Sequence, residues 1–314
     1  MPGRVPTFVV AGAGRAGTTG LVEGLRCHPD VFVTSPKEPH YLAMHGTRPD
    51  FRGPGDQESI NRVAITREQD YLGLFSAAAA DHHALGEGSV STLYYHERAL
   101  PELLRLNPEV RVVVLLREPV SRAWSSFHYL RAQGREPEQD FLTAVADEPR
   151  RRAANWHHLW HYTSMSRYAA AIAVLQDRLL PGHLGVWFHD DLERDYKSTL
   201  DDVVQFLELP ALALSLDDVP RVNVSGTPRF QSLQEAMWRA QRQESVRRAG
   251  RMLTTWRFRE ALKARMLRRD SVPEEVVRTL EREFTDDLVR LGQLLAPSTR
   301  LPEWLTRAGG APVR

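Results

Sequence analysis

The stretch TFVVAGAGRAGTT, residues 7–19, joins an apolar run to a glycine-rich turn. An apolar run without alternation is typical of a strand covered on both faces, as in a parallel sheet. The turn leads into a segment that we predict to be helical over residues 18–26. Residues 31–34 then form a second apolar run, which predicts another buried strand. Strand, turn, helix and strand in this order make one βαβ unit.

The rest of the chain continues this alternation. The pattern predicts further strands at 84–87, 111–116 and 184–188, and a loop over 45–70. It predicts helices at 71–80, 100–106, 119–133, 162–179, 199–207 and 273–295. Alternating strands and helices indicate an α/β fold with a parallel sheet flanked by helices. We expect one domain over 1–314, with a core at about 7–210 and a helical C-terminal part at about 230–300.

Ligands of parallel α/β sheets bind at the carboxyl ends of the strands. We therefore expect the functional site on the edge formed by the loops at 12–19, 35–40, 86–94 and 117–125.

Composition limits the classes of protein to consider. The chain has 314 residues and a formal net charge of +1, which argues against nucleic acid as a partner. Its single cysteine, Cys27, excludes an internal disulfide. No apolar stretch approaches the roughly 20 residues of a membrane span, and no signal peptide is evident. These features predict a cytoplasmic protein.

Three interpretations compete for the glycine-rich turn. Gly12 and Gly17, followed by Thr18 and Thr19, have the spacing of a phosphate-binding loop, although Thr18 stands where such loops carry lysine. Gly12, Gly14 and Gly17 also match the dinucleotide fingerprint, for which Glu38 lies near the position of the ribose-binding acid. A tight structural turn is the third interpretation. The turn alone leaves all three open.

A second motif favours the phosphate interpretation. Residues 115–127 read LLREPVSRAWSSF, in which Arg117 follows a strand and Ser125 lies on the next helix. Together with GRAGTT at residues 14–19, this motif resembles the family of sulfotransferases that use 3′-phosphoadenosine 5′-phosphosulfate (PAPS), especially its bacterial and heparan-type branch. The resemblance implies a fold like that of P-loop nucleotide kinases, with helical additions on the C-terminal side.

The resemblance also implies roles for both motifs. The first would hold the 5′-phosphosulfate through Gly14, Arg15, Ala16, Gly17, Thr18 and Thr19. Arg15 is a departure, because the family often has lysine there. Arg117 and Ser125 would hold the 3′-phosphate. Arg229, in the stretch NVSGTPR at residues 223–229, resembles part of a late loop that closes over the cofactor. No metal is expected.

Further matches extend the resemblance over about residues 7–210, among them PKEPHY at 36–41 and GEGSVSTLY at 86–94. They imply Glu38 as the catalytic base, with His40 as the alternative, and Lys37 close to the sulfate. Ser89 and Tyr94 are expected at the acceptor. The acceptor would be a hydroxyl or amine of a secondary metabolite, a glycolipid or a saccharide. The oligomeric state stays open, with a homodimer among the options, and a flavin- or NAD-dependent oxidoreductase or a non-catalytic nucleotide-binding module is the alternative.

Overall fold

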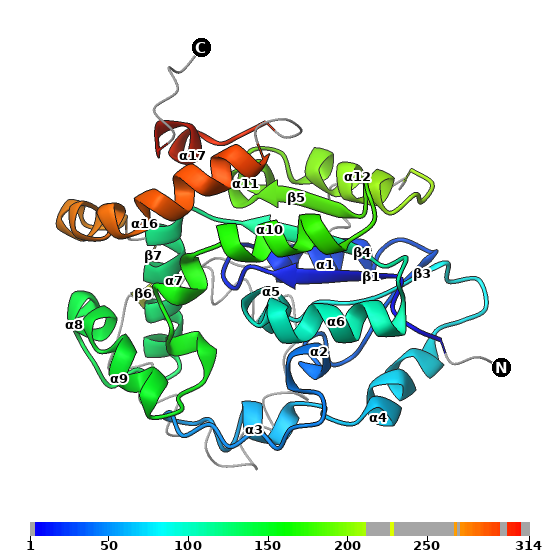
Figure 1. Cartoon of the computed structure of the whole chain (residues 1–314), viewed down its shortest axis with the longest axis horizontal. Helices are drawn as coiled ribbons and strands as arrows, with labels where there is room; N and C mark the ends of the chain where they lie inside the picture. Colours follow the sequence, from blue (N-terminus) through cyan, green and yellow to red (C-terminus); the bar gives the residue numbers. More distant parts are fainter. Residues whose placement is uncertain (1–3, 212–226, 229–266, 269–270, 296–299, 309–314) are drawn as a thin grey trace.

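A computed structural model describes residues 4–211, 227–228, 267–268, 271–295 and 300–308 (Figure 1). Its centre is a five-stranded parallel sheet of order β2-β3-β1-β4-β5. The strands are β1 (Phe8–Gly12), β2 (Val31–Val33), β3 (Ala84–Glu87), β4 (Arg111–Leu116) and β5 (Leu184–Phe188). A separate antiparallel pair joins β6 (Thr227–Pro228) to β7 (Leu267–Arg268). The predicted α/β class and the five predicted strands are confirmed.

The two central strands explain why the sheet forms here. Val10 of β1 lies opposite Val113 of β4, and both side chains are completely buried. Residues on both faces of these strands are covered, so each strand can be apolar throughout. Burial of an aliphatic side chain contributes about 1.5–3 kcal/mol. The apolar runs of the sequence therefore become the core of the domain.

The strand order bears on the dinucleotide interpretation of the glycine-rich turn. In the dinucleotide-binding fold, β2 lies directly beside β1. Here β3 separates β2 from β1. The sheet therefore does not have the dinucleotide-binding topology, and the P-loop-like arrangement implied by the resemblance is confirmed.

Helices cover both faces of the sheet. Figure 1 shows α6 and α10 in front of the strands and α1 behind them. Helix α1 packs against α12, and α16 packs against α10 and α17. The helices around the sheet are α1 (Thr18–Leu25), α5 (Ser91–Tyr94), α6 (His96–Leu106), α7 (Pro119–Ala132), α10 (Ala169–Arg178), α11 (His189–Arg194), α12 (Tyr196–Phe206), α16 (Glu274–Leu295) and α17 (Glu303–Ala308). The outer segments carry α2 (Tyr41–Met44), α3 (Ile60–Val63), α4 (Glu68–Gly73), α8 (Phe141–Ala146) and α9 (Glu148–Ala153).

Several predicted helix bounds are wrong. The segment 162–179 is helical only from Ala169, where α10 begins. The residues before α10 instead form a turn, because Glu148 accepts hydrogen bonds from the backbone of Thr163 and Ser164. Asp287 of α16 then accepts from the backbone N–H of Ala169 at 3.2 Å. Local periodicity cannot report such distant capping groups.

Smaller differences occur at other helices. The predicted helix 71–80 is α4 followed by a 3₁₀ turn, Leu74–Ala77. Helix α6 begins before the predicted residue 100, and α3 lies inside the predicted loop 45–70.

Among the described residues, no helix is both long enough and apolar enough to cross a membrane.

A buried ion pair holds the segment that connects α7 to α10. Arg151 and Glu136 are joined by two hydrogen bonds of 2.7 and 2.9 Å, and both side chains are completely buried. The Tyr162 hydroxyl also donates to Glu136. Removal of one partner leaves an uncompensated buried charge.

We therefore expect Arg151→Ala to lower the free energy of unfolding by about 3–5 kcal/mol. Urea denaturation measures this loss. Arg150→Ala is the matched control, because Arg150 pairs with Asp147 on the surface and a pair in water contributes little. Equal losses for the two variants would contradict the role given to the buried pair.

Candidate functional site

The glycine-rich turn follows β1 and leads into α1. Gly17 has φ 96° at the start of α1, a conformation that residues with a side chain rarely adopt. A Cβ on Gly17 would lie 2.9 Å from Leu192 Cδ1 of α11. Arg15 has φ 71°, which is uncommon for a residue other than glycine and is typical of functional sites. The turn therefore needs glycine at 17, and the free backbone N–H groups of a helix start are the kind of donors that bind anions in proteins.

Gly17→Ala is expected to weaken anion binding by this turn about 10-fold, because a left-handed alanine costs about 1–2 kcal/mol. The measurement is calorimetric titration with adenosine 3′,5′-bisphosphate (PAP). Gly73→Ala is the control, since a Cβ at Gly73 meets no atom within 4 Å. An affinity in Gly17→Ala equal to that of the control would contradict this account of the turn.

The two predicted phosphate motifs meet in space. Arg15 Nε donates a hydrogen bond of 3.3 Å to Ser125 Oγ of α7. Arg117 Nη1, just after β4, donates one of 3.0 Å to the carbonyl of Arg15. Because β1 and β4 are parallel neighbours, their carboxyl ends lie on one edge and bring these residues together.

Arg122 is a further arginine of this group, and the sequence analysis gave it no role. Its side chain is completely buried, one turn before Ser125 on α7. It donates to Ser166 Oγ at 2.6 Å and to the carbonyls of Tyr162 at 2.7 Å and Gly14 at 3.5 Å. Within the described chain these partners are all uncharged oxygens. Arg122 lies three residues before Ser125 on the same helix, so the two side chains are neighbours on one helix face, and this spacing predicts that Arg122 lies near Ser125.

The side chains of Arg15, Arg117 and Arg122 give this partly buried site a strong positive charge. Burial lowers the pKa of Arg15 to about 10, with further lowering by the neighbouring charges of Arg117 and Arg122. Burial also lowers the pKa of Arg117 and of Arg122. All three remain charged at neutral pH, and like charges held together in a protein repel. An anion with several charges would relieve this repulsion.

Lys37, Glu38 and His40 form a corner beside the turn. Lys37 Nζ donates to Glu38 Oε1 at 3.0 Å and to Thr18 Oγ1 of α1 at 3.4 Å. The His40 backbone N–H donates to Ser89 Oγ at 3.1 Å, and His40 Nδ1 lies 3.0 Å from Ser91 Oγ. Lys37 therefore bridges Glu38 to Thr18 of the predicted phosphosulfate loop, and His40 is held beside them through Ser89 and Ser91.

The protonation of both base candidates suits proton abstraction. Burial raises the pKa of Glu38, but the charge and hydrogen bond of Lys37, together with His40 when it is protonated, outweigh it and the net pKa lies below its ordinary value. Burial lowers the pKa of His40. At neutral pH Glu38 is a carboxylate and His40 is neutral, so each is able to accept a proton.

The predicted acceptor residues lie in different surroundings. Ser89 is buried beneath the His40 corner. The Tyr94 hydroxyl lies 2.8 Å from His161 Nδ1, and its ring stacks on His158 at 5.8 Å. His157 and His158 are buried, and their rings lie 6.5 and 6.3 Å from that of His40.

No group of three or more His, Cys, Asp or Glu in the described residues could hold a metal ion.

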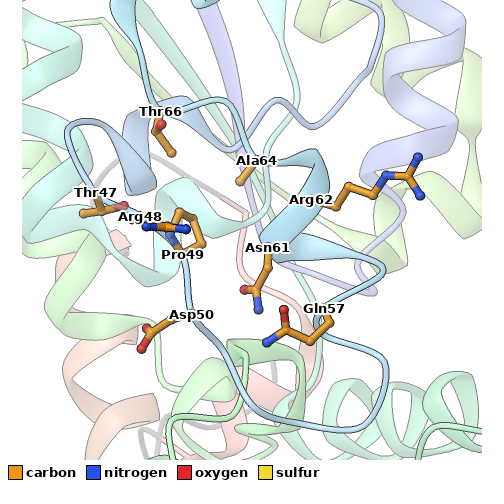
Figure 2. A pocket seen from close by; sticks show the side chains of 9 residues that line it. All are labelled: Thr47, Arg48, Pro49, Asp50, Gln57, Asn61, Arg62, Ala64 and Thr66. Atoms are coloured by element: carbon orange, nitrogen blue, oxygen red, sulfur yellow. The ribbon is translucent and has the colours of Figure 1, made fainter.

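A polar pocket of about 650 Å³ lies on the segment that follows this corner (Figure 2). Ile65 N donates to the Pro39 carbonyl at 2.9 Å, so the pocket segment returns to the residue after Glu38. In Figure 2 the guanidinium of Arg62 points away from the other lining side chains. The pocket is lined by Thr47, Arg48, Pro49, Asp50, Gln57, Asn61, Arg62, Ala64 and Thr66. The sequence pattern of this region predicts only a loop.

The remaining predicted residues divide in two groups. Ala16 is buried within the turn, and Thr19 lies in the first turn of α1. Arg229 lies outside the described residues.

Residues 6–213 match the model of a family described as the sulfotransferase family. Carbohydrate sulfotransferase 15 of Mus musculus and that of Homo sapiens are each 28% identical in an alignment 177 residues long, which covers 46% of this chain. The match covers only 30% of each relative's length. The crystal structure of a sulfotransferase from Alicyclobacillus acidocaldarius shares the fold, with a TM-score of 0.72, 24% identity, and coverage of 96% of this chain and 99% of that one.

Proposed function

Because the chain belongs to the sulfotransferase family, we propose that it transfers the sulfuryl group of PAPS to a hydroxyl or amine of an acceptor. The bond between sulfur and the phosphate oxygen of PAPS breaks, and a bond forms between sulfur and the acceptor atom. The acceptor loses its proton to a base, and PAP leaves. No other reactant is needed for this balance.

The proposal rests mainly on one observation. Arg15, Arg117 and Ser125 come from motifs about a hundred residues apart in the chain, yet hydrogen bonds join them in one group. Arginine binds phosphate and sulfate oxygens with two parallel hydrogen bonds. PAPS carries a 3′-phosphate and a 5′-phosphosulfate, and this group offers separate cations for the two ends.

The other residues have proposed roles around this anion site. Gly14, Ala16, Gly17, Thr18 and Thr19 surround the phosphosulfate with N–H and hydroxyl donors. Lys37 joins Thr18 to Glu38 and would neutralise charge on the sulfuryl oxygens in the transition state. Glu38 is proposed as the base, with His40 as the alternative. Arg229 is proposed to contact the cofactor.

The acceptor is proposed to approach from the side of the polar pocket. Seven of its nine lining residues are polar or charged, and Arg48 has no hydrogen-bond or ion-pair partner among the described residues. Apolar ligands occupy pockets lined mainly by apolar and aromatic side chains. This lining supports a water-soluble acceptor rich in hydroxyl groups, such as a saccharide or a polar metabolite, with Ser89 and Tyr94 nearer the reacting atom.

Binding distinguishes this function from its alternatives. We expect PAP to bind in calorimetric titration, and NAD and FAD to show no heat under the same conditions. Incubation with ³⁵S-labelled PAPS and paired acceptors, glucose with glucosamine and 4-nitrophenol with 4-nitroaniline, then separates hydroxyl from amine transfer. Binding of NAD in place of PAP would sink the proposal, and PAP binding without any labelled product would favour a non-catalytic module.

A further inference from the structure

Glu87 is a buried carboxyl group to which neither the resemblance nor the proposed chemistry assigns a role. It is the last residue of β3, and none of its surface is exposed. Oε2 accepts a hydrogen bond of 2.6 Å from Ser89 Oγ, whereas Oε1 has no hydrogen-bond partner among the described residues. A buried carboxyl group with one unpaired oxygen is costly for the fold, so its position calls for a function.

A chain of hydrogen bonds leads from Glu87 to the base candidates. A serine hydroxyl has one proton, and Ser89 gives it to Glu87. The lone pairs of Ser89 Oγ are then free to accept the His40 backbone N–H at 3.1 Å. His40 has φ 59°, a left-handed conformation that a residue with a side chain adopts only when its surroundings hold it. The neighbouring Gly88 N–H donates to the Lys37 carbonyl at 3.0 Å, which fixes the other end of the corner.

We propose that Glu87 is a positioning residue for sulfuryl transfer, which acts through Ser89 to hold the backbone of the Lys37–Glu38–His40 corner against the phosphosulfate loop. This inference rests on the proposed function. Glu87 does not touch the reacting atoms, and it acts by fixing where Glu38 and His40 stand. Displacement of a catalytic group by about 1 Å can cost about 100-fold in rate.

The ionisation of Glu87 should make this role visible in the dependence of turnover on pH. Burial raises its pKa to about 7, the hydrogen bonds from Ser89 lower it, and the charge of Glu38 raises it further. The titratable groups that face Glu87 are Glu38 and Lys37 from the corner and Tyr71 from α4. The ionised carboxylate is the stronger acceptor for Ser89, and its charge makes Glu38 a stronger base. Turnover should therefore rise as the pH rises through about 7.

The test measures the pH profile of turnover with PAPS, with glucose as the probe acceptor, because its hydroxyl groups do not ionise near pH 7, and with water in its absence. In Glu87→Gln the amide carbonyl still accepts from Ser89 but does not ionise. We expect this variant to lose the step near pH 7 and to stay at the acid-side rate of the wild type. In Glu87→Ala we expect kcat to fall about 100-fold at every pH, with the Kd of PAP unchanged.

Glu102→Gln is the matched control. Glu102 is also a buried glutamate, but hydrogen bonds from Arg105 lower its pKa to about 2, so its ionisation does not change near neutrality. This variant should keep the step. As an independent readout, infrared spectra of the PAP-bound wild type should contain a carboxylic acid band that titrates near pH 7 and is missing in Glu87→Gln.

Two outcomes overturn the inference: a step near pH 7 that survives in Glu87→Gln, or a joint loss of kcat and PAP affinity in Glu87→Ala, which marks a merely structural role. Failure of the proposed function looks different. In that case the wild type itself releases neither sulfate nor sulfated product from PAPS at any pH.

Discussion

Arg117→Ala is expected to weaken the binding of PAP about 100-fold. Arg117 is half-buried at the end of β4 and holds the carbonyl of Arg15, so the change removes one cation and loosens the turn that carries the next. Loss of one partner of a hydrogen-bonded charge pair costs about 2–5 kcal/mol in binding. Part of this loss is offset because Arg15 and Arg122 no longer feel the repulsion of a third charge. Calorimetric titration with PAP measures the change.

Arg178→Ala is the control for this prediction, because Arg178 is an exposed arginine at the end of α10. It should bind PAP as the wild type does. Ser125→Ala removes a neutral donor and should cost less than Arg117→Ala, since hydrogen bonds to charged groups are the stronger ones. If Arg117→Ala binds PAP like the control, Arg117 is not part of the anion site.

Glu38→Gln is expected to lower kcat by about 100- to 10,000-fold, with the Kd of PAP nearly unchanged. Glutamine keeps the size of the side chain and its contact with Lys37, but it is not able to take the acceptor proton. Steady-state turnover of PAPS and calorimetric titration with PAP measure the two quantities separately. His40→Asn should have the smaller effect. Normal turnover in Glu38→Gln together with loss in His40→Asn would move the role of base to His40.

The acid side of the wild-type pH profile tests Glu38 as the base. A base works only above its own pKa. The pKa of Glu38 lies below the ordinary glutamate value, so with Glu38 as base some activity should persist below about pH 4.3. The step expected from Glu87 lies well above this range. The two groups can therefore be distinguished in one profile.

Much of the fold could be predicted because the decisive signals are local. Four of the five strands are built on apolar runs bounded by glycine, proline or polar residues, β3 (sequence ALGE) is the exception, and all five lie close to the predicted residues. The order of the strands could not be predicted, because nothing in the sequence of β3 says that it lies between β2 and β1. The start of α10 depends on Asp287, more than a hundred residues further along the chain.

The candidate site shows the same limit. Arg117 and Ser125 could be predicted from their motif, and the meeting with Arg15 follows from the common edge of a parallel sheet. Glu87 is also within a recognised stretch, but its burial depends on the packing around β3 and no local pattern reports it. The histidines at 157 and 158 reach His40 only through the folding of the α9–α10 connection.

The fate of the sulfur atom in ³⁵S-labelled PAPS tests the central claim most directly. Wild-type protein with 4-nitrophenol is expected to release one PAP for each labelled 4-nitrophenyl sulfate, over many turnovers per protein molecule. The rate should fall in Arg117→Ala through weaker binding and in Glu38→Gln through slower chemistry. PAPS that remains intact with the wild type, while PAP binds normally, would contradict the assignment of this chain as a sulfuryl-transferring enzyme.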